Sequence, residues 1–314
     1  MSDSCGYIAV DHGDNPRIIV AFRGTYSVSN TIVDLSTVPQ EYSAYPGETD
    51  GSDAPRCVNC TVHSGFSQSW NVTSSTITAY VAEAVAVYHD YKLVLVGHSL
   101  GGAVAALAGL DYAARGWNPT VTTFGEPRIG NAALMQYIDN RFKLGNGTSE
   151  RSDAQHVSQN QDIDLRYRRV THIDDPVPLL PLSEWGYRMH AGEIFISKGA
   201  LSPDITDLHH CSGDEDNECI AGQDPSLSMA ADLALTKRAL TPDDDEAATD
   251  TLMSLPEAVE QADEADRSDH DWSVPARYKL WQLFFAHRDY FWRLGLCVPG
   301  GDPWDWGRDK YELI

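Results

Sequence analysis

Residues 94–102, Val-Leu-Val-Gly-His-Ser-Leu-Gly-Gly, constrain the fold of this chain more than any other stretch. The apolar, β-branched start predicts a buried strand, and the Ala-rich residues 103–108 predict a helix directly after the glycines. A strand, sharp turn and helix of this kind hold a serine side chain above the end of a parallel sheet. Gly97 and Gly101 fit this geometry because a Cβ atom at either position would meet the neighbouring strand or helix. Ser99 is therefore the candidate nucleophile.

Two backbone N–H groups are expected to stabilise the negative charge on a carbonyl oxygen that Ser99 attacks. The amide of Leu100 lies at the start of the predicted helix, where free N–H groups favour an anion. The second donor is expected just after an early strand. Residues 22–25, Phe-Arg-Gly-Thr, provide a strand end, a glycine and then Thr25. Leu100 and Thr25 are thus the candidate oxyanion-hole residues.

The order of the predicted elements indicates an α/β fold with a mostly parallel central sheet flanked by helices. Two short strands joined by a turn come first, over 6–10 and 17–23, and strands then alternate with helices. Further strands are predicted at 92–96, 120–124, 167–171 and 193–197, and helices at 73–91, 103–115 and 130–141. A chain of 314 residues allows one large domain or two small ones, and we predict a single domain over 1–314.

The acidity of the chain is concentrated in one segment. Residues 204–271 hold 20 acidic and 3 basic side chains, so this segment accounts for −17 of the net charge of −23. The segment is also poor in large apolar residues, which predicts a largely disordered insertion. Its charge argues against a nucleic-acid partner. A calcium site is the alternative, but the spacing of known calcium loops is missing, so no metal is predicted.

The six cysteines predict disulfides and hence an oxidising compartment, because their number is even and four of them form local pairs. Cys57 lies close to Cys60 and Cys211 close to Cys219, whereas Cys5 and Cys297 lie near the two ends. A redox or zinc site at residues 57–60 is disfavoured, since the chain has no second C-x-x-C motif.

Features of targeting point in two directions. Three N-x-[ST] sequons, at Asn59, Asn71 and Asn146, are compatible with secretion. Residues 1–16 are polar and show no signal-peptide pattern. The chain also has no apolar run of about eighteen residues, so no transmembrane helix is predicted.

A nucleophilic serine requires a histidine base and a carboxylate that orients this base, in the chain order Ser, Asp or Glu, His. The loop after the strand at 167–171 offers Asp174 and Asp175, and the pattern alone does not separate them. Five histidines follow this loop: His190, His209, His210, His270 and His287. Three of them lie in or beside the acidic segment, where a general base would be poorly held. Position favours His287, among aromatic residues near the C-terminus, over His190.

Several motifs in this order resemble the fungal class 3 lipases, the family that also contains feruloyl esterases. The matching blocks lie at 22–25, 97–102, 124–131, 167–172, 175–178, 186–190 and 286–291. The resemblance implies an α/β-hydrolase fold and hydrolysis of carboxylic esters through an acyl-enzyme, without a cofactor. It further implies a secreted fungal lipase acting on triacylglycerol or other acylglycerols.

The resemblance also implies the roles of individual residues. The family's catalytic aspartate falls on Asp175 rather than Asp174, and its catalytic histidine falls on His287, whereas His190 matches a structural histidine. Thr25 and Leu100 match the oxyanion positions of the family.

For the cysteines, the resemblance implies a short disulfide between Cys57 and Cys60. A pair like Cys211–Cys219 occurs in the feruloyl esterase branch. The late cysteine of the family pairs with a cysteine in an N-terminal helix and strand that this chain lacks, so we expect Cys297 to pair with Cys5 instead.

Residues 27–35 resemble the lid of these lipases and are expected to cover an apolar acyl groove at a lipid–water interface. The candidate lid residues are Ser27, Ile32, Val33 and Leu35, and the alternative for the apolar patch at 32–35 is a strand edge or a turn of a core helix. Thr31 stands where lipases often carry tryptophan, which argues against strong activation at an oil interface. Two alternatives remain: a feruloyl-type carbohydrate esterase, which the second disulfide favours, and a catalytically inactive binding protein of the hydrolase fold.

Overall fold

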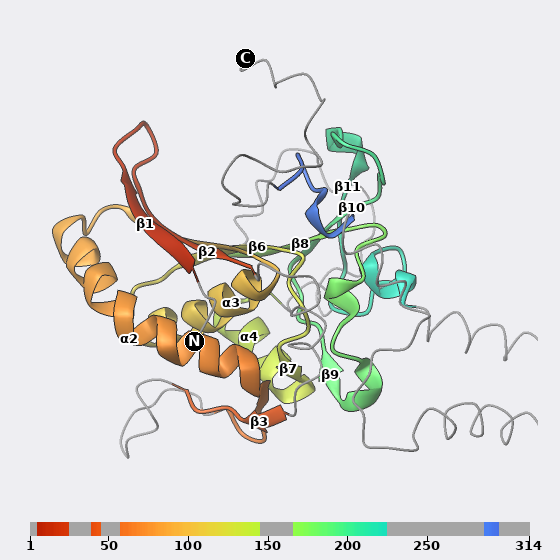
Figure 1. Ribbon diagram of the computed structural model, residues 1–314, viewed down its shortest axis with the longest axis horizontal. Helices are drawn as coiled ribbons and strands as arrows, with labels where there is room; N and C mark the ends of the chain where they lie inside the picture. Colours follow the sequence, from red (N-terminus) through yellow and green to blue (C-terminus); the bar gives the residue numbers. More distant parts are fainter. Residues whose placement is uncertain (1–4, 25–38, 45–56, 145–165, 225–285, 295–314) are drawn as a thin grey trace, which may run out of the picture.

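The structure, a computed structural model, describes residues 5–24, 39–44, 57–144, 166–224 and 286–294 (Figure 1). Thr25, the candidate lid, Cys297 and residues 225–271 of the acidic segment lie outside the described residues, so what was expected of them stays a prediction. None of the described helices has the length and apolar character needed to cross a membrane.

A seven-stranded sheet forms the centre of the molecule, in the order β1-β2-β5-β6-β8-β10-β11. These strands are β1 Cys5–Asp11, β2 Arg17–Arg23, β5 Lys92–His98, β6 Thr120–Phe124, β8 Tyr167–His172, β10 Glu193–Ile196 and β11 Leu208–His210. The strands from β2 to β10 run parallel, while β1 and β11 pair antiparallel at the two edges. The predicted mostly parallel sheet is therefore confirmed. Its parallel strands all end at the same edge, where the candidate site lies.

A small antiparallel sheet lies beside the central one, in the order β3-β4-β7-β9. Its strands are β3 Pro39–Glu41, β4 Thr61–His63, β7 Gly130–Asn131 and β9 Tyr187–Arg188. The predicted disulfide Cys57–Cys60 is present and closes the turn before β4. The Asn131 amide Nδ2 donates to the Asn59 carbonyl in this turn, with an N–O distance of 2.8 Å.

Three helices pack on one side of the central sheet, α2 Ser64–Val87, α3 Leu100–Ala114 and α4 Ala132–Phe142 (Figure 1). The middle one, α3, is buried along almost its whole length and contacts β2, β5 and β6. Its small alanine and glycine residues allow this close approach to the sheet. At Gly109, an added Cβ would lie 2.7 Å from the side chain of Val121.

Helix α2 begins earlier than the predicted start at residue 73. The prediction started too late because the Gly, Ser and Asn residues near the start of this helix have low helix propensity. In the structure, the His63 ring accepts a hydrogen bond from the Phe66 amide and caps the helix, and Phe66 and Trp70 are buried. The predicted end at residue 91 is also too late, because Tyr88 leaves the helical conformation and packs against Tyr91. The burial of Phe66 and Trp70 thus extends the helix at its start, whereas a local contact accompanies its end.

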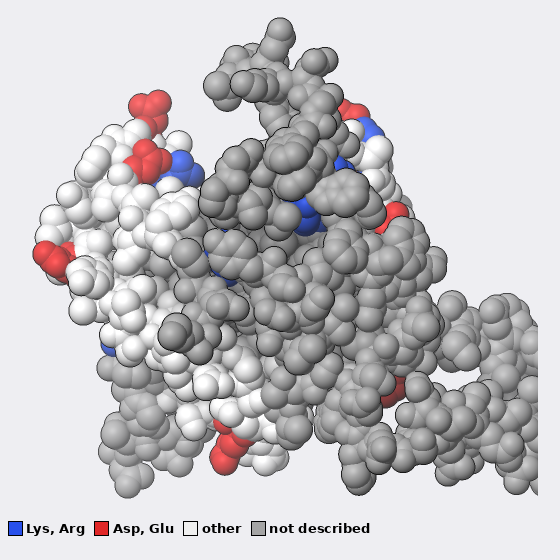
Figure 2. All heavy atoms as spheres, viewed as in Figure 1, with Lys and Arg blue, Asp and Glu red and all other residues white. Residues whose placement is uncertain are grey.

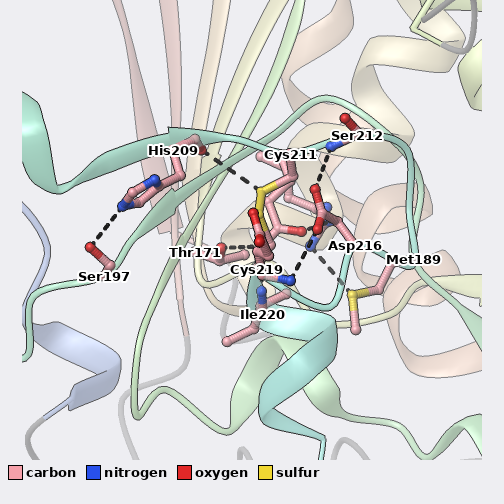
Figure 3. Close-up of a disulfide and its surroundings, with 12 residues drawn as sticks. Thr171, Met189, Ser197, His209, Cys211, Ser212, Asp216, Cys219 and Ile220 are labelled. Carbon is pink, nitrogen blue, oxygen red and sulfur yellow. Dashed lines mark hydrogen bonds and ion pairs between the residues drawn. A yellow bond between two sulfur atoms is a disulfide. The ribbon is translucent and has the colours of Figure 1, made fainter. Parts of the chain in front are cut away.

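The prediction of disorder from residue 204 onward is wrong for its first part, because residues 204–224 fold onto the sheet. They form the 3-10 turn η3 Ile205–Asp207, strand β11 and the 3-10 turn η4 Ile220–Gln223. The disulfide Cys211–Cys219 joins β11 to η4 (Figure 3). The Ile220 amide donates to a Glu193 carboxylate oxygen at 3.2 Å, and Asp224 forms a buried ion pair with Arg128 at 2.9 Å. The disulfide and these buried carboxylates offset the ordering entropy that composition alone predicted would prevail.

Figure 2 shows how charged side chains are distributed over one face of the described residues. On the face shown in Figure 2, the acidic and basic side chains of the described residues are scattered singly or in small groups among uncharged ones. This agrees with the small net charge that the sequence assigns to the chain outside residues 204–271.

Candidate active site

Ser99 occupies the turn between β5 and α3 in a strained backbone conformation, with φ 58° and ψ −129°. Non-glycine residues adopt a positive φ of this kind mainly where the fold forces them to. The two glycines around it are sterically required: a Cβ on Gly97 would overlap the Gly101 carbonyl, and a Cβ on Gly101 would overlap the Phe22 carbonyl. The Ser99 amide donates to the Phe124 carbonyl at 3.0 Å, which ties the turn to β6.

Asp175 and His287 form a buried pair. Nδ1 of His287 lies 2.9 Å from Oδ2 and 3.1 Å from Oδ1 of Asp175. Of the two adjacent aspartates, Asp175 is the buried one, with 1% of its surface exposed. Asp174 is exposed to solvent, and its backbone has a positive φ of 70°. It is Asp175 that the loop after β8 turns inward, toward a histidine 112 residues further along the chain.

Two further groups fix the Asp175 carboxylate. The Tyr290 hydroxyl donates to Oδ2 at 2.6 Å, and the Val177 amide donates to Oδ1 at 2.9 Å. Burial would raise the pKa of Asp175, but the charge of His287 and these hydrogen bonds outweigh it and hold the pKa below its ordinary value. The carboxylate therefore stays ionised at neutral pH and can stabilise a positive charge on His287.

The other nitrogen of His287, Nε2, is buried and has no hydrogen-bond partner among the described residues. The imidazole ring lies against the ring of His98, with 4.4 Å between the ring centroids. Because His98 directly precedes Ser99, this contact brings the histidine beside the nucleophile turn. The hydrogen bond between a catalytic serine and its histidine is often long in the absence of substrate and tightens in the reacting complex.

Gly125 lies directly against the pair at φ 56°. A Cβ atom at this position would lie 2.8 Å from Cε1 of His287, 2.9 Å from Oδ2 of Asp175 and 2.7 Å from the Tyr290 hydroxyl. The backbone after β6 thus forms one wall of the site and leaves no room for a side chain.

The candidate oxyanion positions are placed in part. Helix α3 begins at Leu100, so the Leu100 amide has no partner four residues earlier within the helix. Gly24, which immediately precedes Thr25, is packed against the nucleophile turn, since a Cβ on it would lie 2.9 Å from Cβ of Ser99. Thr25 itself lies outside the described residues.

His190, the competing histidine, belongs to a different cluster. Its Nε2 lies 3.1 Å from Oε1 of Glu126, and its Nδ1 donates to the Ala191 carbonyl at 2.7 Å. The Thr123 and Tyr167 hydroxyls donate to the other oxygen of Glu126 at 2.6 and 2.7 Å. Both ring nitrogens of His190 are therefore engaged in the interior, which agrees with the structural role that the resemblance implied.

Sequence reasoning missed three residues of this site, Tyr290, His98 and Gly125. Each stands within a motif noted in the sequence, but its role depends on contacts between residues far apart in the chain. The Tyr290 hydroxyl, for example, reaches a carboxylate 115 residues away. Only the pairing of the loops after β6 and β8 with residues 286–290 shows what these side chains touch.

Comparison with known proteins places the chain in a family. The model of the class 3 lipases matches residues 19–185. A secreted mono- and diacylglycerol lipase 2 from Gibberella zeae is 48% identical over 99% of this chain and 73% of the relative, and lipase A from Sodiomyces alcalophilus is 49% identical over 99% and 74%. The crystal structure of the Lip2 lipase from Yarrowia lipolytica has a TM-score of 0.58 at 34% identity, covering 70% of each chain. The family match and the full-length similarity agree with the fold and motifs described above, and this chain belongs to the class 3 lipases.

Proposed function

We propose that this protein is a secreted, single-domain serine ester hydrolase that cleaves acylglycerols, with mono- and diacylglycerols as the first substrates to test. Acylglycerol substrates and secretion follow the names of the similar lipases. The observation that carries the chemistry is the buried Asp175–His287 pair: Nε2 of His287 has no partner among the described residues, and its ring lies against His98, next to Ser99.

In the proposed mechanism, the Ser99 hydroxyl attacks the ester carbonyl while Nε2 of His287 accepts its proton. The resulting imidazolium is stabilised by Asp175, which stays ionised because its pKa is lowered. His287 then gives the proton to the leaving alcohol, and an acyl-enzyme forms on Ser99. A water molecule, activated by His287 in the same way, releases the fatty acid.

The oxyanion of each tetrahedral intermediate is assigned to the amides of Leu100 and Thr25. Leu100 is favoured by its place at the start of α3, and Thr25 by the contact of its neighbour Gly24 with Ser99. Each donor of this kind contributes about 3 kcal/mol to the stabilisation of the transition state in other enzymes. The chemistry requires no metal or organic cofactor.

The test compares the wild-type enzyme with Ser99→Ala on p-nitrophenyl butyrate. We expect the variant to lose at least about 10⁴-fold in kcat while its melting temperature stays close to that of the wild type. Retained turnover in the variant would contradict the assignment of the nucleophile.

Substrate class is tested with the same enzyme on monoolein, diolein and triolein emulsions and on methyl ferulate. Faster release of oleate than of ferulate supports the acylglycerol assignment. Preference for methyl ferulate would instead favour a feruloyl-type esterase, the alternative that the disulfide Cys211–Cys219 raised. Absence of turnover on every ester would indicate a binding protein.

A further inference from the structure

His98 touches the proposed base of this enzyme in two ways. Its Nε2 lies 2.7 Å from the backbone carbonyl oxygen of His287, and the two imidazole rings are 4.4 Å apart at an interplanar angle of 34°. The hydrogen bond joins residues 189 positions apart in the sequence. It therefore links the nucleophile turn directly to the segment that carries the base.

The partner of His98 determines its tautomer. A carbonyl oxygen only accepts hydrogen bonds, so Nε2 of His98 must carry a proton and donate a hydrogen bond to the His287 carbonyl oxygen. Loss of hydration on burial, followed by the charge of His287, lowers the pKa of His98 to about 3. The ring is therefore neutral at neutral pH, with the proton on Nε2, and it adds no positive charge beside His287 when that residue becomes an imidazolium.

The surroundings of His98 hold it in this orientation. On one side, Gly24 packs closely against His98: a Cβ atom added to Gly24 would lie 3.6 Å from Nδ1 and 2.8 Å from the carbonyl oxygen of His98. On another side, the Tyr290 ring makes an edge contact with His98, with 6.0 Å between centroids. Asp175 and Arg288 are the other charged groups that act on His98, besides His287 itself.

Through the hydrogen bond from His98, the backbone of residues 286–288 is connected to the end of β5. These residues form the short 3-10 turn η7, and the segment 286–294 joins neither sheet; its one described β-bridge, Asp289–Arg293, lies within the segment. The side chain of His287 is oriented through Nδ1 by Asp175, but that bond fixes only one end of the residue. The bond from His98 fixes the other end, at the backbone.

We infer that His98 is a positioning residue for ester hydrolysis: by donating a hydrogen bond from Nε2 to the His287 carbonyl, it holds the base in line with Ser99. The inference rests on the triad proposed above. A general base displaced by about 1 Å loses on the order of 10²-fold in rate, which sets the size of the expected effect.

The test uses two variants of similar size that differ in the donor, His98→Gln and His98→Met. Glutamine has an amide N–H close to the place of Nε2, whereas methionine has no donor there. We expect His98→Met to lower kcat on p-nitrophenyl butyrate about 10- to 100-fold with KM nearly unchanged. We expect His98→Gln to keep kcat within about 5-fold of the wild type, and both variants to have similar melting temperatures.

Labelling of Ser99 by a p-nitrophenyl phosphate diester gives a second readout that is independent of the natural ester. The rate of this labelling should fall in His98→Met and be restored in His98→Gln. Equal losses in both variants, or no loss in either, would overturn the positioning role and leave only ring packing. If the phosphate labels the wild type and Ser99→Ala equally, the triad itself is wrong, which separates the two failures.

A measurement on the wild-type enzyme does not depend on the stability of any variant. Nitrogen-15 NMR of labelled histidines between pH 5 and 9 should show His98 as a neutral ring with its proton on Nε2 throughout this range. A proton on Nδ1, or titration of His98 to an imidazolium in this range, would contradict the inference.

Discussion

Two clusters in this molecule contain the same three kinds of side chain, a carboxylate, a histidine and a tyrosine, and both are buried. In one, Asp175 binds Nδ1 of His287 and leaves Nε2 without a partner among the described residues. In the other, Glu126 binds Nε2 of His190, while Nδ1 of this ring donates to a backbone carbonyl.

The difference between the clusters teaches that composition does not distinguish a reactive site from a structural one. What distinguishes them is whether the histidine retains a nitrogen able to take a proton from a substrate or nucleophile. The lowered pKa of both carboxylates has the same origin, since burial is outweighed in each case by the charge and hydrogen bonds of the neighbours. A lowered carboxylate pKa therefore does not distinguish the proposed active site from the structural cluster.

The largest expected effect separates the two histidines by activity. His287→Ala should lower kcat by at least about 10⁴-fold, because it removes the base proposed to take the proton of Ser99. The fold should be retained, which circular dichroism and thermal melting would check. A variant that keeps more than about a tenth of wild-type kcat would show that His287 is not the base.

Gly125→Ala should cause the next largest loss of activity, because it inserts a methyl group among the side chains of Asp175, His287 and Tyr290. The positive φ of Gly125 adds strain. We expect a loss of about 10²-fold in kcat, measured with p-nitrophenyl butyrate, together with a lower melting temperature. Gly116→Ala is the matched control, since Gly116 also has a positive φ but a Cβ there meets nothing within 4 Å. Equal kcat values in the two variants would refute the steric explanation.

His190→Ala should affect stability rather than chemistry. It leaves the Glu126 carboxylate buried without its partner His190, and removing the partner of a buried charge costs about 3–5 kcal/mol in the free energy of unfolding. Urea denaturation measures this loss, and active-site titration gives kcat per folded molecule. A large fall in kcat at unchanged stability would reverse the comparison between the two clusters.

Tyr290→Phe should have the smallest effect. It removes one hydrogen bond to a charged carboxylate, so we expect the free energy of unfolding to fall by about 1.5–3 kcal/mol. The pKa of Asp175 is lowered in the folded protein, so its contribution to stability is present above the unfolded pKa and is lost as pH falls through the folded value. Without the tyrosine hydroxyl the folded pKa rises, so the variant should unfold at a higher pH during acid titration. An unchanged acid midpoint would contradict this account.

The sequence predicted much of this fold because its strongest signals are local. The strand, turn and helix around Ser99 and the parallel strands follow from periodicity and glycine positions, and Thr120–Phe124 agrees with the predicted strand at both ends. The start of α2 was missed because the burial of Phe66 and Trp70 overrides poor helix propensity. The folding of residues 204–224 was missed because composition does not show that Asp224 meets Arg128.

The candidate site was predicted to a similar extent. The pairing of Asp175 with His287 agrees with the residues that the family resemblance implied. The roles of Tyr290, Gly125 and His98 were not visible, because they arise from contacts across more than a hundred residues or from the backbone conformation of a single glycine.

The long separation between the members of the proposed triad has a consequence for the nascent chain. Ribosomes make Ser99 and Asp175 well before His287, and the proposed base can reach its carboxylate only after residue 287 has emerged. A nascent chain that stops before residue 287 would thus hold the turn around Ser99 but lack its proposed base. Any ester hydrolysis that depends on the proposed triad can begin only after this residue has been made and has reached Asp175.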